Sequence, residues 1–153
     1  MNIDDVRQLH TLVWSYRKRL SDLWPTPNRE DSLAFAFTEI GEAVDAKLRQ
    51  NPIYNRNHDK NINVENELAD CLIMLLTALG EEFKFTDMYS CFFTDLPFLA
   101  VCVTELFGWF STNESVAVTC YAITHNEIWN GFDIYGVVWN RLDRIEKRVT
   151  CAN

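Results

Sequence analysis

Apolar residues recur every three or four positions along most of this chain, which is the spacing of one face of an α-helix. The pattern predicts six helical stretches, at residues 3–23, 31–49, 64–82, 97–110, 115–129 and 134–149. Few segments alternate between apolar and polar residues, so we expect little or no β-sheet. The predicted fold class is therefore all-α, a helical bundle of about five to six helices built on a helix-loop-helix hairpin at residues 30–82.

The two helices of that hairpin carry acidic residues at the edge of their apolar stripes. The expected core stripe of the first hairpin helix is Leu33, Phe37, Ile40, Val44 and Leu48, and that of the second is Leu68, Leu72, Leu75 and Leu79. Solvated charges usually lie opposite the apolar face of a helix. Here they border it, so we expect them at a cleft between packed helices.

Length and charge narrow the kinds of protein that this chain can be. With 153 residues, of which 48% are hydrophobic, we expect one domain spanning residues 1–153 with a sizeable core. The net charge of −8 argues against a nucleic-acid polymer as partner, because binding to a phosphate backbone needs a basic surface. No apolar stretch is long enough to span a bilayer, and the acidic N-terminus is unlike a signal peptide. The five cysteines include no CxxC pair, and the simplest interpretation is free thiols in the cytoplasm.

Two acidic pairs, Glu39 with Glu42 and Glu67 with Asp70, carry the strongest chemical signal. Each pair has i, i+3 spacing, so both carboxylates project from one face of a helix, and none has a Lys or Arg three or four positions away. Antiparallel packing of the two helices would gather all four carboxylates, which repel one another without a cation. Oxygen ligands favour Mg2+, with Mn2+ as the other choice. The plainer alternative is a solvated acidic face.

Two other acidic residues have a basic partner one turn away, as solvated surface charges often do. Sequence motifs for other metal or nucleotide sites are missing. Asp45 can pair with Arg49, and Asp143 with Lys147, both at i, i+4 spacing. The sequence contains no Glu-x-x-His, no His-Glu-x-x-His and no Gly-x-x-x-x-Gly-Lys loop. Di-iron bundles, zinc proteases of that type and P-loop enzymes are therefore not indicated.

The acidic hairpin resembles the MazG-like, all-α nucleoside triphosphate pyrophosphohydrolases, a superfamily that includes dimeric dUTPases, dCTP pyrophosphatases and phosphoribosyl-ATP pyrophosphatases. Their signature is Glu-Glu-x-x-Glu on one helix and Glu-x-x-Asp on the next. Here the first part reads Thr38-Glu39-Ile40-Gly41-Glu42 and the second Glu67-Leu68-Ala69-Asp70. The resemblance is strongest over residues 30–82, about a third of the chain. It implies an enzyme that hydrolyses a nucleoside triphosphate, first of all a dNTP, to the monophosphate and pyrophosphate.

The resemblance also implies roles for particular residues. The expected catalytic and Mg2+-binding residues are Glu39, Glu42, Glu67 and Asp70. The expected substrate-binding residues, on the joining loop and the final helix, are Tyr54, Arg56, Lys60, Asn140, Arg144 and Lys147. Trp24 and Phe35 are further candidates for stacking on a base. For each of these residues the alternative is a solvated charge or ordinary packing. A homodimer is expected by resemblance alone.

Two departures from the family pattern are a Thr in place of its first Glu, and Trp139 where a Lys often precedes the Asn of the final helix. Thr38 stands where the family has its first Glu, so a catalytically impaired nucleotide-binding, metal-binding or regulatory module is the second hypothesis. A helical adaptor without metal is the third, and it requires the four carboxylates to be exposed and spread apart. Residues 91–129 add helices beyond the minimal fold, and Leu99 to Glu105 weakly repeat Leu33 to Glu39, as a duplication or by chance.

Overall fold

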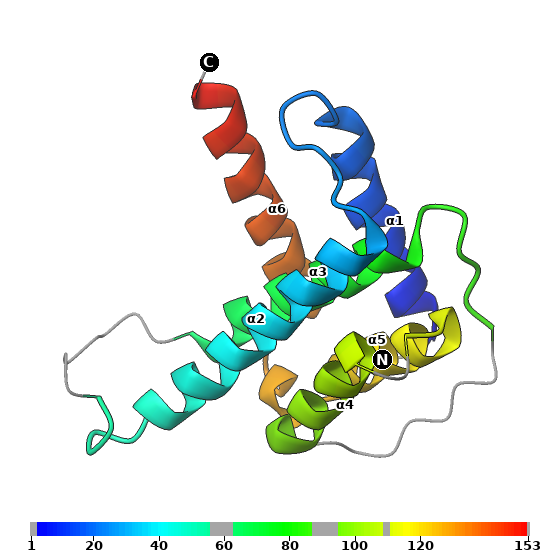
Figure 1. The fold of residues 1–153 in the computed structure, drawn as a ribbon. Helices are drawn as coiled ribbons and strands as arrows, with labels where there is room; N and C mark the ends of the chain where they lie inside the picture. Colours follow the sequence, from blue (N-terminus) through cyan, green and yellow to red (C-terminus); the bar gives the residue numbers. More distant parts are fainter. Residues whose placement is uncertain (1–2, 56–62, 87–94, 109–110, 153) are drawn as a thin grey trace.

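The computed structural model describes residues 3–55, 63–86, 95–108 and 111–152 (Figure 1). This part of the chain contains no β-strand, and the all-α prediction is confirmed. The helices are α1 (Ile3–Arg19), α2 (Arg29–Arg49), α3 (Val64–Leu79), α4 (Leu96–Gly108), α5 (Asn113–Thr124) and α6 (Ile134–Cys151), with a short 3-10 helix, η1 (Glu127–Trp129). No helix in these ranges is long and apolar enough to cross a membrane.

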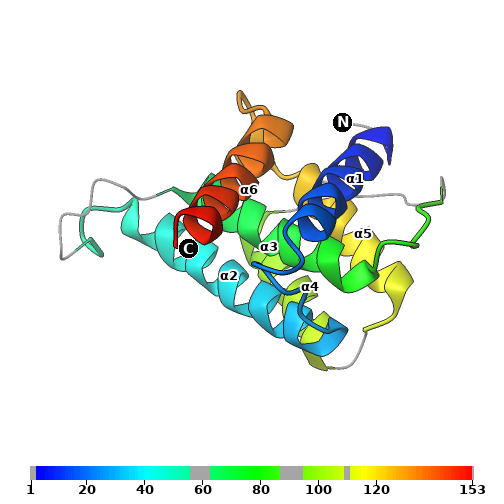
Figure 2. The same ribbon diagram turned by 90° about the horizontal axis from the view of Figure 1, so that it is seen from above.

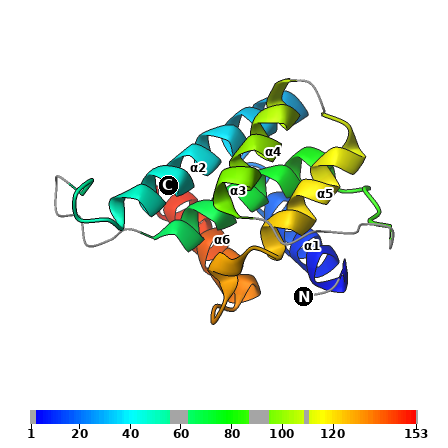
Figure 3. The ribbon, with the colours of Figure 1, turned by 90° about the horizontal axis from the view of Figure 1, so that it is seen from below.

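The helices form three layers. The α2–α3 hairpin is the middle layer, and its two helices make the most extensive contact in the molecule. Helices α1 and α6 pack over one side of this hairpin, as seen from above in Figure 2. Helices α4 and α5 lie against the other side, α4 on α2 and α5 on α3 (Figure 3). Helix α3 is therefore covered on two sides, by α1 and α6 on one and by α5 on the other, whereas α2 packs against α3 and α4.

Side-chain caps set the starts of the two hairpin helices. The side chain of Asn28 accepts a hydrogen bond from the backbone N–H of Asp31 at 2.8 Å, and that of Asn63 accepts one from Asn66 at 2.9 Å. Helix α2 begins two residues before its predicted start, because its polar first turn lacks the apolar period. Helix α3 ends three residues before its predicted end, where Gly80 has a φ of +81°, a conformation that suits glycine.

The buried face of α2 differs in part from the predicted core stripe, whereas Leu68, Leu72, Leu75 and Leu79 of α3 are buried as predicted. On α2, Ala36 and Ala43 are fully buried, whereas Phe37 and Leu48, which we expected in the core, are 43% and 54% exposed. The buried face of α2 thus centres on Leu33, Ala36, Ile40 and Ala43, to one side of Phe37. Phe37 instead stacks on Phe107 of α4, with 5.4 Å between the ring centroids.

Helix α1 is fastened to α3 by polar contacts at the C-terminal half of α3. Trp14 donates a hydrogen bond from Nε1 to the carbonyl of Leu76 at 3.2 Å, and Nε2 of His10 lies 2.9 Å from the carbonyl of Gly80. His10 thus has the structural role that its position near the apolar stripe favours. These contacts fix the rotation of α1 and direct Arg17, farther along it, toward α3.

The cysteines in the described ranges are free thiols. Cys71 on α3 and Cys120 on α5 are fully buried, Cys102 is half-buried and Cys151 is exposed. Burial raises the pKa of both Cys71 and Cys120, so these two thiols stay protonated. Cys91 lies outside the described residues.

Candidate metal centre

Three acidic side chains converge between α2 and α3. Glu39 from α2 and Glu67 and Asp70 from α3 each place a carboxylate oxygen within 4.8 Å of the other two. All three side chains are half-buried. Glu42, one turn beyond Glu39, is exposed and lies outside this group of oxygens. Antiparallel packing of the two i, i+3 pairs thus brings three of the four predicted carboxylates together and leaves the fourth at the rim.

The acidic cluster concentrates negative charge in a partly dehydrated place. Burial, together with the nearby negative charges of Asp70, Glu42 and Glu67, raises the pKa of Glu39 to about 7. The pKa of Glu67 is also raised, first by burial and then by Asp70. Raised pKa values of neighbouring carboxyl groups show that the cluster lacks compensating positive charge, which is the condition that favours a divalent cation.

One positive side chain, Arg141 of α6, meets the acidic cluster directly. Its Nε donates to Oδ1 of Asp70 at 2.8 Å, and its Nη2 donates to Oδ2 of the same carboxylate. This paired hydrogen bonding raises the pKa of the guanidinium. Arg141 offsets part of the charge of the cluster, and it also lowers the pKa of Glu39 and of Glu67 against the rise from burial. A cation entering the cluster would share Asp70 with Arg141 or displace it.

The acidic cluster opens into a cavity of about 370 Å3 between α1, α2, α3 and α6. Its wall combines acidic, basic and flat apolar groups, which are Glu39, Asp70, Arg17, Arg141, Arg148, Trp24, Pro27 and Phe35. The volume falls within the range of about 300–1,000 Å3 that small-molecule sites occupy. A ligand with a charged part and a flat part would find both kinds of partner in this cavity.

The residues that we expected to bind substrate lie elsewhere or outside the described ranges. Tyr54 is exposed in the turn after α2, and it does not line the cavity. Asn140, Arg144 and Lys147 are exposed on α6, and Lys147 pairs with Asp143 at 2.7 Å. Arg56 and Lys60 belong to residues 56–62, which the structure does not describe.

The residues of α6 that line the cavity each follow, by one position, a residue that we expected to bind substrate. Arg141, Ile145 and Arg148, at i, i+4 and i+7 spacing, line the cavity in place of Asn140, Arg144 and Lys147. The spacing itself was available in the sequence. Trp24 and Phe35, the other two stacking candidates, do line the cavity. The sequence analysis missed Arg17, Arg141 and Arg148.

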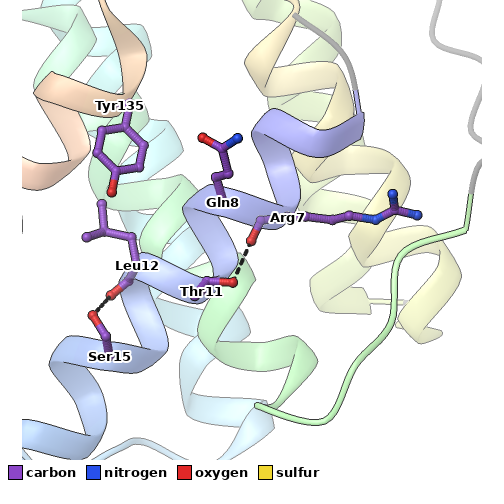
Figure 4. A pocket seen from close by; sticks show the side chains of 6 residues that line it. All are labelled: Arg7, Gln8, Thr11, Leu12, Ser15 and Tyr135. Atoms are coloured by element: carbon purple, nitrogen blue, oxygen red, sulfur yellow. Dashed lines mark hydrogen bonds between the residues drawn. The ribbon is translucent and has the colours of Figure 1, made fainter.

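A second, more open groove of about 640 Å3 runs between α1 and the start of α6, lined by Arg7, Gln8, Thr11, Leu12, Ser15 and Tyr135 (Figure 4). Two of its hydroxyls, those of Thr11 and Ser15, donate hydrogen bonds to nearby backbone carbonyls. Thr11 donates to the carbonyl of Arg7 at 3.0 Å, and Ser15 donates to that of Leu12 at 2.6 Å. Arg7 extends away from Tyr135 and donates to the carbonyl of Phe85 at 2.9 Å. This larger groove has no acidic residue in its lining, so it offers no carboxylate to hold a metal ion.

The donor set of the acidic cluster fits a hard divalent cation. All of its ligand atoms are carboxylate oxygens, which suit Mg2+ or Mn2+ and lack the nitrogen or sulfur that zinc prefers. Comparisons with models of known families, with curated proteins and with solved structures find no match to this chain. A function for this protein is therefore inferred from the geometry of the cluster and its cavity.

Proposed function

We propose that this protein is a Mg2+-dependent nucleoside triphosphate pyrophosphohydrolase that converts a dNTP to its monophosphate and pyrophosphate. The observation that carries the proposal is the convergence of Glu39, Glu67 and Asp70 at the edge of a cavity with basic and aromatic walls. The resemblance of the α2–α3 hairpin to the MazG-like superfamily supports the same reaction. It also suggests a cytoplasmic location and a homodimer. Sedimentation of the purified protein would test the dimer.

In the proposed site the chain binds and orients the substrate. Glu39, Glu67 and Asp70 would hold Mg2+, with Glu42 near the rim. When bound, Mg2+ would neutralise and polarise the triphosphate. Arg141 and Arg148 would bind phosphate oxygens, because planar guanidinium groups pair well with phosphate.

The aromatic wall of the cavity supports a nucleotide rather than a bare polyphosphate as ligand. Trp24 and Phe35 present flat side chains on which a base can stack, and Pro27 extends this apolar part of the wall. The half-buried setting of the carboxylates also limits the access of water, which strengthens electrostatic contacts with the phosphates.

The test is Mg2+-dependent pyrophosphate release from a panel of dNTPs and NTPs. Wild-type protein should release pyrophosphate from at least one of them, and Glu67→Gln should lose nearly all of this activity. The matched control is Asp45→Asn on α2, which removes a carboxylate that pairs with Arg49 at 2.7 Å on the surface. Equal activity of Glu67→Gln and wild type would refute the proposed site.

A catalytically impaired nucleotide-binding module is the second candidate, and Thr38 favours it. Thr38 is exposed, and its hydroxyl donates to the carbonyl of Ala34 at 3.2 Å. The position where the related enzymes have a Glu thus offers no carboxylate and a hydroxyl already engaged with the backbone. Nucleotide binding measured by calorimetry, with no pyrophosphate released from any nucleotide, would support this candidate over hydrolysis.

A further inference from the structure

Arg17 of α1 is a charged side chain in an unusual setting. It is only 1% exposed, yet it lines the same cavity as Glu39 and Asp70. Its Nε donates to Oγ1 of Thr77 at 3.3 Å, and its Nη2 has only the sulfur of Met74 as a weak acceptor at 3.6 Å. The ring of Trp24 covers one face of the guanidinium, 3.4 Å from the carbon atom Cζ.

The third nitrogen of this guanidinium lacks an acceptor. Within the described part of the chain, Nη1 of Arg17 is buried and has no hydrogen-bond partner. Burial lowers the pKa of Arg17 to about 10, and no acidic group contributes an opposing shift. Buried charges are ordinarily paired, and a buried donor without an acceptor destabilises the fold. Arg17 is therefore better explained by a ligand than by the stability of the ligand-free protein.

The contacts of Arg17 place it at the aromatic end of the cavity. Met74 and Thr77 follow Asp70 by four and seven residues on α3, which corresponds to about 6 Å and about 10 Å along the helix axis. The guanidinium thus lies one to two turns from the acidic cluster, beside Trp24. If phosphates lie at the cluster, the part of a nucleotide that reaches this end is the base.

We propose that Arg17 determines base specificity by donating from Nη1 to a carbonyl oxygen of the base, an inference that rests on the proposed nucleotide function. A guanidinium only donates hydrogen bonds, so it favours a base with an oxo group over one with an amino group at the same position. The substrate class is then an oxo-substituted base, such as uracil or hypoxanthine, in preference to its amino counterpart, cytosine or adenine.

The neighbours of Arg17 leave a route for this contact. Trp24 covers the face of the guanidinium, whereas the N–H groups point outward in its plane. Trp24 lies in the turn after α1 rather than in a helix, and Met74 has a flexible, unbranched side chain. A modest shift of these two half-buried side chains brings a base to Nη1.

The test uses two ligand pairs that differ at one position, dIMP with dAMP and dUMP with dCMP. Calorimetric titrations at fixed Mg2+ report binding without turnover. Wild type should bind the oxo member of at least one pair about tenfold more tightly, as expected for one hydrogen bond to a charged donor. Arg17→Met should reduce that preference to within about twofold, and Arg17→Lys should keep part of it.

The control is Arg19→Met, which removes an arginine that pairs with Glu146 at 2.8 Å and does not line the cavity. It should leave the preference unchanged. The inference is overturned if wild type shows no preference, if folded Arg17→Met keeps it, or if Arg17→Met weakens all four ligands equally, which would indicate a phosphate contact. If Arg17→Met does not fold, an unchanged preference in Arg17→Lys overturns the inference instead.

Failure of this inference can be told apart from failure of the proposed function. Oxo-selective binding without pyrophosphate release would support the role of Arg17 and refute hydrolysis. Hydrolysis of dNTPs without any oxo preference would refute only the role of Arg17. A protein that neither binds these nucleotides nor releases pyrophosphate would refute both.

Discussion

Replacing Arg141 by Met should show that this arginine acts as the internal counter-ion of the acidic cluster. The substitution keeps a long apolar stem and removes the charge that binds Asp70. The two side chains are 25% and 17% exposed, so their pair lies between an exposed pair, worth about 0.2–1 kcal/mol, and a buried pair, whose disruption costs about 3–5 kcal/mol. We expect the metal-free variant to lose about 2 kcal/mol of unfolding free energy, or about 4–8 °C in melting temperature.

Thermal unfolding in the presence of a chelator, and then with Mg2+, is the assay. Because Arg141 and a metal ion share Asp70, Mg2+ should stabilise Arg141→Met more than it stabilises wild type. The control is Lys147→Met on the same helix, which breaks an exposed i, i+4 pair and should cost no more than about 0.5 kcal/mol. If Arg141→Met and Lys147→Met are equally stable without metal, or Mg2+ stabilises wild type and Arg141→Met alike, the reasoning is refuted.

Three further predictions concern the same cluster. Mg2+ should raise the melting temperature of wild type in a concentration-dependent way, and Ca2+ should bind but support less turnover, which melting curves and pyrophosphate release would show. Because the folded-state pKa of Glu39 is raised from its ordinary value of 4.5 to about 7, the folded protein holds a proton that the unfolded chain releases. Metal-free stability should therefore fall as pH rises from about 4.5 to about 7, and Glu39→Gln should flatten that slope in denaturant titrations. Thr38→Glu should raise steady-state turnover by about tenfold or more if a carboxylate at this position acts as a general base. If wild type already turns over rapidly and Thr38→Glu is no faster, the departure at Thr38 is harmless.

The helices and the centre of the acidic cluster were predictable from local spacing. Glu39, Glu67 and Asp70 meet because the packing of α2 against α3 turns one member of the first i, i+3 pair toward both members of the second. The sequence could not show that Glu42 would be exposed, since that depends on how α2 is rotated against α3. The expected burial of Phe37 was wrong for the same reason: the ring contacts Phe107 of α4 and stays 43% exposed.

The basic residues of the cavity could not be predicted from the sequence, for a different reason. Helix α6 has charged residues on neighbouring stripes, and only its rotation against α3 decides that Arg141 rather than Asn140 meets the cluster. In the sequence, Arg17 is one of three consecutive basic residues in the last turn of α1, and nothing in that pattern marks it as buried. Its burial comes from the docking of α1 on α3 and from Trp24 beyond the end of the helix, which are tertiary features.

The buried thiols of Cys71 and Cys120 allow the opening of this fold to be measured by chemical labelling. Cys71 follows Asp70 on α3, Cys120 lies on α5 in the adjoining layer, and both are closed to solvent, whereas Cys151 is exposed. A thiol reagent will therefore modify Cys151 first, the half-buried Cys102 more slowly, and the two buried sulfurs only when the layers around them separate. The rate at which Cys71 and Cys120 are labelled measures how often the packing between α3 and α5, beneath the acidic cluster, opens in the native protein. No engineered probe is needed.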